Sequence, residues 1–225
     1  FGDTISIHMN RASDVFTHTV RYAFGDRTGT IATGVGTGTT WQIPESFMEL
    51  LPSSTSGSGT IYVDTYHGDT FIGTKSCGFT ATVPASVKPI CTFTLDDITT
   101  ADQLYGSPVK GLSKIKIDVV PGITLYPSPI VAYTISANGE FFTEAEATTG
   151  VLKTAGTSRA TATITDARGR TGTRSYDMTV LDYVEPAVTK LTVQRCNEDG
   201  SATAKIDFPA WLKKHKHSRM SLASA

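Results

Sequence analysis

Polar and apolar residues alternate along much of the chain, which is the pattern of β-strands that bury one face. Residues 4–9 alternate in this way, and residues 15–24 continue the pattern. In the second segment five large side chains fall on one side, namely Phe16, His18, Val20, Tyr22 and Phe24. We interpret the polar residues 10–14 as a hairpin turn, so that the two flanking strands pair with each other.

Glycine and proline divide the next part of the chain into further short elements. Residues 34–38 are rich in glycine, Pro44 suits the first turn of a helix, and His67-Gly68-Asp69 is a turn signal. The expected elements are, in order, paired strands at 29–33 and 39–43, a helix at 44–51, a loop at 53–59, a hairpin of 60–66 and 70–73, and a last strand at 76–83.

The second half of the chain repeats this patterning. Asn138-Gly139 suits a tight turn with positive φ, and Gly169 suits the left-handed position of a hairpin loop at 166–172. The strands expected here are at 91–95, 114–120, 130–135, 141–142, 151–152, 160–165 and 174–180. In residues 114–120 Lys and Asp alternate with Ile and Val, which predicts one solvated and one buried face.

Prolines separate the two halves and mark the end of the second. Pro84 and Pro89 bracket a short linker, and Pro186 follows the last strand of the second half. Short strands with turn signals every 8–12 residues are typical of immunoglobulin-like sandwiches. We therefore predict an all-β chain with two tandem immunoglobulin-like antiparallel β-sandwiches, at residues 1–85 and 89–183. Residues 186–225 would form an incomplete third unit that opens with a strand at 188–193, and a basic C-terminal tail without strands from Thr203.

Composition supports this fold and narrows the function. Of the 225 residues 36 are Thr, whose β-branched side chain suits a half-exposed sheet, and charged residues make up only 18%. The formal net charge is −1, so a chain-wide basic field for nucleic acid is absent. An apolar run long enough for a transmembrane helix and the regions of a signal peptide are absent from the sequence, and we expect no membrane insertion.

The sequence contains three cysteines, Cys77, Cys91 and Cys196, which are too few for a disulfide scaffold. We interpret them as half-buried thiols in strands. A Cys77–Cys91 disulfide stays open, because it requires Cα atoms within about 7 Å. Without a C-x-x-C pair, a zinc site is not expected.

The sequence offers no catalytic motif and no cofactor-binding or metal-binding motif. His8 and His18 would be cross-strand neighbours, most simply as hydrogen-bonded residues of a sheet, while His67 lies in a turn and His215 and His217 in the basic tail. The acidic groups Asp64/Asp69 and Asp96/Asp97/Asp102 lack the spacing of a calcium loop and are interpreted as solvated loop charges. We therefore expect a protein that is not an enzyme, without catalytic, cofactor or metal residues.

Aromatic side chains are the remaining candidates for a binding role. If exposed, they could stack on sugar rings: the candidates are Trp41, Tyr62, Tyr66, Tyr105, Tyr126 and Tyr133. One buried tryptophan is expected in a sandwich core, so the structural interpretation is favoured for Trp41. A glycan site requires two or more of these rings beside amides and carboxylates in one groove, whereas a structural protein would have them scattered.

Several segments resemble, in the same order, a family of minor structural tail proteins from siphophages and prophages of Gram-positive bacteria. The segments are residues 9–13 (MNRAS), 16–19 (FTHT), 31–37 (IATGVGT), 83–87 (VPASV), 111–114 (GLSK), 165–171 (TDARGRT) and 191–197 (LTVQRCN). The resemblance implies a virion component near the distal tail with repeated immunoglobulin-like modules, and it supplies no catalytic residues.

From this resemblance we expect a non-enzymatic structural protein of the virion, a spacer and assembly module of the phage tail. Its partners would be other tail proteins, in a symmetric homo-oligomer with three-fold or six-fold symmetry. The alternative is an adhesion module of the tail that binds polysaccharide on the host surface. A cell-wall hydrolase is the third class, and it would need converging carboxylates or a metal site.

Overall fold

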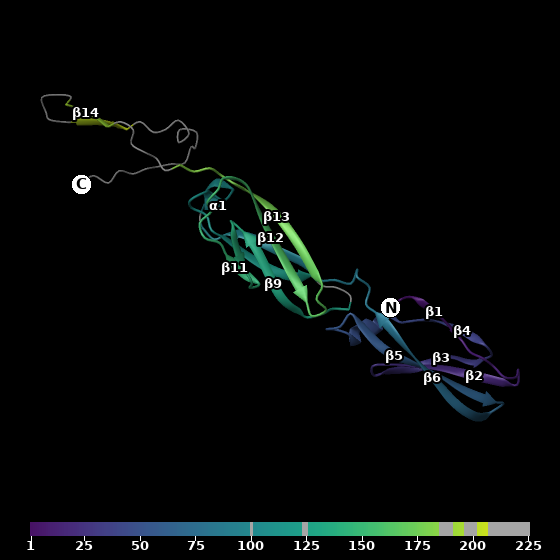
Figure 1. The fold of residues 1–225 in the computed structure, drawn as a ribbon. Coiled ribbons are helices and arrows are strands. Elements are labelled where there is room, and N and C mark those ends of the chain that lie inside the picture. Colours follow the sequence, from purple (N-terminus) through teal and green to yellow (C-terminus); the bar gives the residue numbers. More distant parts are fainter. Residues whose placement is uncertain (100, 123–125, 185–190, 196–201, 207–225) are drawn as a thin grey trace. The chain divides into compact units, whose positions relative to one another are not determined.

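The computed structural model describes residues 1–99, 101–122, 126–184, 191–195 and 202–206 (Figure 1). Residues 1–181 form one compact unit, and residues 182–225 belong to a second. Strands dominate the described residues, and the sheets are antiparallel, which confirms the all-β prediction. In this part of the chain, neither helix is long and apolar enough to cross a membrane.

The first sandwich consists of a two-stranded and a four-stranded sheet. The small sheet pairs β1 (Thr4–His8) with β4 (Gly38–Gln42). The large sheet has the order β3 (Arg27–Val35), β2 (Phe16–Phe24), β5 (Ser56–His67) and β6 (Thr70–Thr82). Between the sheets lies a core of Phe1, Phe24, Ile43, Phe47, Met48, Ala81 and Val83.

Two predicted pairings in this sandwich are wrong. β1 does not form a hairpin with β2, and β3 does not pair with β4. β1 and β4 belong to the small sheet, whereas β2 and β3 belong to the large sheet. Residues 10–14 therefore cross from one sheet to the other, and Arg11 bonds the carbonyls of Asp14 and Phe16 at this crossing. Alternation decides which face of a strand is buried, but it carries no information on the partner strand.

The hairpin around His67-Gly68-Asp69 is confirmed, and Gly68 has a φ of 56°. The predicted loop at 53–59 is wrong in its second half, because β5 already begins at Ser56. Gly59 belongs in the strand for a steric reason: a Cβ there would overlap the ring of Phe79 and lie 2.9 Å from the carbonyl oxygen of Ala23. The strands expected at 70–73 and 76–83 are the single long strand β6.

The predicted helix at 44–51 is present as the 3-10 helix η1 (Glu45–Leu50), with Pro44 at its N-terminal boundary. Its buried residues Phe47 and Met48 close one end of the core. Phe47 stacks on Phe24 with a ring separation of 5.3 Å. Burial of this aromatic face stabilises a helix that would be too short to form alone.

The second sandwich has three strands facing four. The three-stranded sheet has the order β11 (Glu146–Thr148), β8 (Ile115–Gly122) and β7 (Ile90–Asp97). The four-stranded sheet has the order β10 (Glu140–Phe142), β9 (Ile130–Ala137), β12 (Gly156–Asp166) and β13 (Thr171–Val180). A short helix α1 (Ala101–Tyr105), which the sequence did not predict, follows β7. The predicted alternation in 114–120 is confirmed, with Ile115, Ile117 and Val119 buried.

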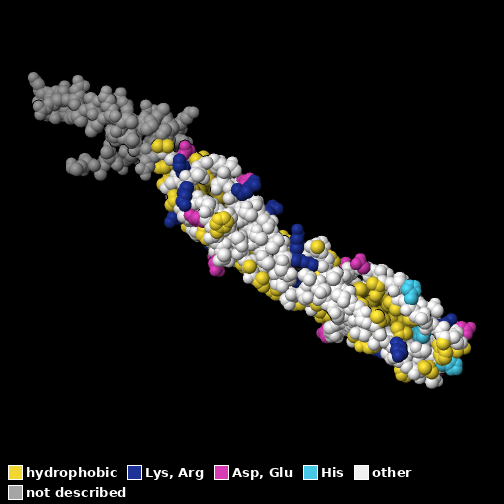
Figure 2. All heavy atoms as spheres, in the orientation of Figure 1, with side chains coloured by type: hydrophobic (Ala, Val, Ile, Leu, Met, Phe, Trp, Pro, Cys, Tyr) yellow, Lys and Arg dark blue, Asp and Glu magenta, His cyan; other side chains and the backbone are white. Residues whose placement is uncertain are grey.

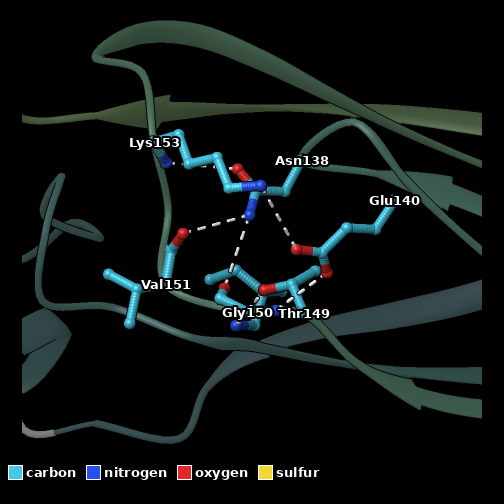
Figure 3. A network of polar contacts seen from close by, with 7 residues as sticks. Asn138, Glu140, Thr149, Gly150, Val151 and Lys153 are labelled. Carbon is cyan, nitrogen blue, oxygen red and sulfur yellow. Dashed lines mark hydrogen bonds and ion pairs between the residues drawn. The ribbon is translucent and has the colours of Figure 1, made fainter.

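The strand expected at 151–152 is absent, and a polar network holds this segment instead (Figure 3). Asn138, at φ 54° in the β9–β10 turn, donates from Nδ2 to the carbonyls of Gly150 and Val151. Its Oδ1 accepts from the Lys153 amide, and Glu140 accepts from the Gly150 amide at 2.8 Å. These bonds take the place of a sheet ladder and leave Leu152 as a buried anchor of the core.

The two sandwiches have the same strand connectivity. β1 pairs with β4 as β8 pairs with β11. The order β3-β2-β5-β6 corresponds to the order β10-β9-β12-β13. The chain therefore contains a structural repeat, and within the described residues β7 has no counterpart in the first sandwich.

The two hydrophobic cores lie on either side of residues 84–89 along the chain. That residues 1–85 and 89–183 are separate folding domains stays a prediction. In the second unit, β14 (Leu191–Arg195) pairs with β15 (Ala202–Ile206). The basic tail expected from Thr203 is thus wrong at its start, since residues 203–206 belong to β15, where the alternation is too short to stand out in the sequence. The remainder of the tail lies outside the described residues.

Candidate binding groove

A groove of about 510 Å³ opens on the first sandwich between β1 and β6. Its floor consists of alternate residues of β5, namely Ile61, Val63 and Thr65, which face the interior of the sandwich. Figure 2 shows hydrophobic side chains and histidines together on the surface of this sandwich. The groove is therefore an opening into the apolar space between the two sheets.

The two sides of the groove are strand edges rather than strand faces. Consecutive residues line it on both sides, 5–10 in and after β1 and 75–79 in β6. Neighbouring residues of a strand point to opposite faces, so an unbroken run borders a groove only along the edge of the strand. Both strands also stand at the end of their sheet, and their outer edges have no partner strand among the described residues.

His18 brings a polar group to the groove. It is 5% exposed, and its Nδ1 lies 3.0 Å from Thr65 Oγ1. Its Nε2 is buried and has no hydrogen-bond partner among the described residues. Nearly all buried polar atoms in native proteins are hydrogen-bonded, so this unpaired buried nitrogen is an exception.

The prediction that His8 and His18 are cross-strand neighbours is wrong. They lie on strands of opposite sheets, so they are not cross-strand neighbours, yet both line the groove. His67 lies away from the groove, with its ring 5.8 Å from that of Phe16. His215 and His217 lie outside the described residues.

The interpretation of Asp64 as a solvated loop charge is wrong. This carboxylate is 5% exposed on the face of β5 opposite to the groove. Arg21 donates to both of its oxygens, at 2.5 and 3.0 Å, and Thr74 donates at 2.6 Å. The hydrogen bonds from Arg21, aided by Thr74, outweigh burial and hold the pKa of Asp64 below its usual range. The carboxylate is a structural acceptor.

We expect Asp64→Asn to lower the free energy of unfolding by about 1–2 kcal/mol at pH 7, because the substitution removes a charged hydrogen-bond acceptor. A group with a depressed pKa stabilises the fold above its ordinary pKa and loses this contribution as pH falls through the depressed value. The difference between the two proteins should therefore shrink below about pH 4. Urea unfolding between pH 3 and 7 measures it, with the exposed turn variant Asp69→Asn as control. A difference that is independent of pH would contradict the assignment.

The other acidic candidates do not converge either. Asp97 accepts from Ser113 Oγ at 2.6 Å and from the amide and hydroxyl of Thr99. Burial opposes its ionisation, but these hydrogen bonds outweigh it and keep the pKa of Asp97 below its usual range. Asp69, Asp96 and Asp102 are exposed, as predicted. The interpretation as loop charges is wrong for Asp96 and Asp97, which lie on β7, and Asp97 is half-buried rather than solvated. Among the described residues, no three His, Cys, Asp or Glu side chains are placed to hold a metal ion.

The candidate aromatic residues are distributed over several surfaces. Trp41, Tyr126 and Tyr133 pack against the two cores, while Tyr105 is exposed on α1. Tyr62 and Tyr66 are half-buried on the outer face of β5, on either side of Asp64. The Arg21 guanidinium lies 5.3 Å from the centre of the Tyr62 ring. These two tyrosines are the one pair that the described residues bring beside a carboxylate.

The predicted position of the cysteines in strands is confirmed for the two described ones, but neither is half-buried, and the disulfide that was left open is absent between them. Cys77 and Cys91 are both free, because Cys77 lies on β6 of the first sandwich and Cys91 on β7 of the second. Cys77 is exposed along the groove. Cys91 is buried, donates to the carbonyl of Ala162 at 3.4 Å, and has a pKa raised by burial.

We expect Cys77 to react with a thiol-specific reagent in the folded protein, and Cys91 to react only after unfolding. The reactivity of a thiol depends on its exposure and on the fraction present as thiolate. Cys91 is buried and its pKa is raised, so both factors lower its reactivity. The measurement is absorbance with a chromogenic disulfide reagent, in a Cys196→Ser background because Cys196 lies outside the described residues. The control is Cys77→Ser, which should leave no rapid phase. Equal labelling rates for the two thiols would contradict the placement of Cys91.

Arg168 and Arg170 make structural contacts that the sequence analysis missed. Both stand in the β12–β13 loop, and Arg168 is only 8% exposed. Arg168 donates to the carbonyls of Met48 and Leu51 at the end of η1 and to that of Tyr126. Burial lowers the pKa of its guanidinium.

Arg170 makes the corresponding contacts with the linker. It donates to the carbonyls of Val83, Pro84 and Val87, at 2.5–2.6 Å. The two arginines thus fasten the β12–β13 loop to η1 and to the linker, and we call them the arginine clamp. In the sequence, these residues appear only as two arginines on either side of a turn glycine. That pattern does not predict backbone carbonyls as the partners of the two arginines.

The described residues therefore define an all-β chain of tandem sandwiches in which Asp64 and Asp97 are structural hydrogen-bond acceptors and the histidines do not converge with them. A family model described as "Siphovirus protein of unknown function (DUF859)" matches residues 1–208. The chain belongs to this family of siphovirus proteins.

Solved structures with a similar arrangement come from varied sources. The PKD1 domain of the Vibrio cholerae metalloprotease PrtV is 25% identical over 42% of this chain and 98% of that domain, with a TM-score of 0.32. The fibronectin(III)-like modules of Clostridium thermocellum CbhA are 12% identical over 80% of this chain and 87% of theirs, with a TM-score of 0.31. A Ca²⁺-stabilized, ice-binding adhesin of an Antarctic bacterium is 17% identical over 88% of this chain and 48% of that one, with a TM-score of 0.32. At these TM-scores we draw no conclusion from them. A comparison with curated proteins gives no match.

Proposed function

We propose that this chain is a non-enzymatic structural component of a siphophage virion, which acts as a spacer and assembly module of the tail. The observation that carries the proposal is the family match over residues 1–208, on a chain of repeated sandwiches. A position near the distal tail, a phage of a Gram-positive host and a symmetric homo-oligomer follow from the sequence resemblance and belong to the proposal.

The arginine clamp supports the role of a spacer. A spacer must resist bending between its modules. Arg168 contributes three hydrogen bonds from one buried side chain to backbone carbonyls that lie far from it in the chain. A guanidinium is suited to this because its donors lie in a rigid plane. The clamp also assigns a structural role to the two arginines of the loop segment at residues 166–170.

The exposed face of β12 and β13 supports the same role. Three cross-strand pairs follow one another on it: Arg159–Asp177, Thr161–Ser175 and Thr163–Thr173. Each hydroxyl pair lies 2.9 Å apart. Such pairs stabilise a sheet and keep its surface polar without net charge.

A structural role also agrees with the condition of the acidic groups. Catalysis needs a carboxylate that can exchange a proton or hold a metal. Asp64 and Asp97 are instead committed as hydrogen-bond acceptors. We therefore assign no catalytic, cofactor-binding or metal-binding residues.

A second candidate function is adhesion to polysaccharide on the host surface. The observation that favours it is the pair Tyr62 and Tyr66 beside Arg21 and Asp64 on the outer face of β5. Tyrosine rings on a sheet can stack on sugars. In a glycan array, binding that Tyr62→Ala and Tyr66→Ala abolish would support adhesion, while binding that neither variant changes would exclude this site.

The proposed function is tested on purified virions. Quantitative mass spectrometry should detect the chain at a fixed number of copies per particle, and electron microscopy with antibody labelling should place it on the tail. Absence of the chain from intact virions, or labelling of the capsid alone, would overturn the proposal.

A further inference from the structure

The turn between β9 and β10 contains the only Asn-Gly pair of the sequence, Asn138-Gly139. The other two asparagines, Asn10 and Asn197, precede Arg and Glu. In an Asn-Gly pair the backbone nitrogen of the glycine can attack the side-chain amide of the asparagine, because glycine has no Cβ to obstruct the approach. This turn is therefore the position at which an asparagine of this chain is chemically most reactive.

Burial does not protect the pair. Asn138 and Gly139 are the central residues of a two-residue turn between paired strands, with φ angles of 54° and 74°. Asn138 is half-buried and Gly139 is exposed, and no atom lies within 4 Å of the position that a Cβ on Gly139 would take. Water therefore reaches the turn, and any protection must come from the contacts of the Asn138 side chain.

The side-chain amide of Asn138 is held at both of its polar atoms (Figure 3). Its Nδ2 donates to the carbonyls of Gly150 and Val151, at 3.4 and 3.2 Å. Its Oδ1 accepts from the amide of Lys153 at 3.2 Å. To bring Cγ within bonding distance of the Gly139 nitrogen, the side chain must rotate, and this rotation breaks the three bonds.

We propose that Asn138 is a deamidation site that this network keeps closed, and that its conversion releases the segment at residues 149–153. In the reaction the Gly139 nitrogen gives its proton to water and forms a bond to Cγ of Asn138. The Cγ–Nδ2 bond breaks, and Nδ2 takes up a proton from water and leaves as ammonia. Water then hydrolyses the five-membered imide to an aspartate or an isoaspartate at position 138. The reaction consumes only water.

The product cannot keep the contacts of the amide. A carboxylate only accepts hydrogen bonds, so it would face the carbonyls of Gly150 and Val151 without a donor. It would also place a second negative charge beside Glu140, whose carboxylate accepts from the Gly150 amide at 2.8 Å. The segment that loses these contacts holds Leu152, which is 2% exposed in the core. Such a lock would preserve a virion component, whose chains are not replaced after assembly, and only this consequence rests on the proposed function.

The first experiment follows deamidation of the purified full-length chain at mildly alkaline pH, by peptide mapping with mass spectrometry. We expect Asn138 to deamidate at least tenfold more slowly in the folded protein than in urea. Glu140→Ala removes the acceptor of the Gly150 amide and should raise the rate in the folded protein at least threefold. The control Glu144→Ala removes an exposed carboxylate and should change this rate less than twofold. Equal rates in the folded and unfolded protein, or equal rates in the two variants, would overturn the protection.

The second experiment measures backbone hydrogen exchange by NMR in Asn138→Asp, which reproduces the product of deamidation without a change of size. We expect the amides of Gly150 and Lys153 to exchange at least tenfold faster than in the parent protein, while the paired amides of β12 and β13 keep their rates. Asn10→Asp makes the same substitution at an exposed position of the first sandwich and should leave all of these rates unchanged. Unchanged exchange at Lys153 in Asn138→Asp would overturn the release of the segment, and so would faster exchange throughout β12 and β13.

Discussion

Replacement of Arg168 by alanine should lower the melting temperature of the protein by about 6–12 °C. The substitution leaves the carbonyls of Met48, Leu51 and Tyr126 without their donor. An unpaired buried polar group costs about 1–3 kcal/mol, and carbonyls can recover part of this from water. We therefore expect a loss of about 3 kcal/mol, which corresponds to about 2–4 °C per kcal/mol for a unit of this size.

Circular dichroism during heating measures this shift, and limited proteolysis reports cleavage in the linker at residues 84–89. The matched control is Arg159→Ala, whose arginine is 67% exposed in a surface pair with Asp177 that water screens, so the melting temperature should change little. Arg168→Lys should recover little, because one ammonium cannot reproduce the planar donor set. Equal melting temperatures of the Arg168→Ala and Arg159→Ala variants, without faster cleavage of the linker, would show that the arginine clamp does not stabilise the linker.

Gly172→Ala should destabilise the protein by about 2–3 kcal/mol, although it adds a single methyl group. A Cβ at Gly172 on β13 would overlap the carbonyl oxygen of Pro89 and lie 3.3 Å from the Cys91 amide nitrogen. Both neighbours are backbone atoms, so no side chain can turn away to make room. The linker or β13 would have to move, and the packing of β7 against β13 would loosen.

The control is Gly73→Ala on β6, where nothing lies within 4 Å of the added carbon. Surface substitutions of this kind stay within about 0.5 kcal/mol. Urea unfolding of the two alanine variants compares them directly. If both variants unfold at the same urea concentration, the close approach of Gly172 and Pro89 does not exist in solution.

The sequence alone was sufficient for the fold class and for most strands. Alternation placed β2, β8, β12 and β13 within a few residues of their observed bounds, and Asn138-Gly139 and Gly68 identified two hairpin turns. These features are local, because side-chain direction in a strand repeats every two residues and turn residues act through their own φ. The absence of a catalytic motif was likewise visible in the residue types themselves.

Strand partners required the tertiary structure. The segment at 10–14 has turn residues whether it joins two paired strands or crosses between sheets, so the β1–β4 pairing was hidden. The glycines at 56–59 predict a loop, but they are required for a steric reason. A Cβ at Gly57 or Gly59 would overlap the ring of Phe24 or Phe79, which lie elsewhere in the chain. Polar composition alone cannot distinguish a solvated glycine from one that makes room for a ring.

The site depended on the fold even more strongly. His18 has an ordinary place in the alternating pattern, and only the tertiary structure shows that it lines the groove and that its buried Nε2 has no hydrogen-bond partner among the described residues. Arg168 finds its acceptors 117 and 120 residues away, in backbone carbonyls that any sequence would provide. The sequence by itself determined which residues face inward, because that property is local and periodic. Only the tertiary structure decided which edges remain free and which charges are buried, because both depend on segments that folding brings together.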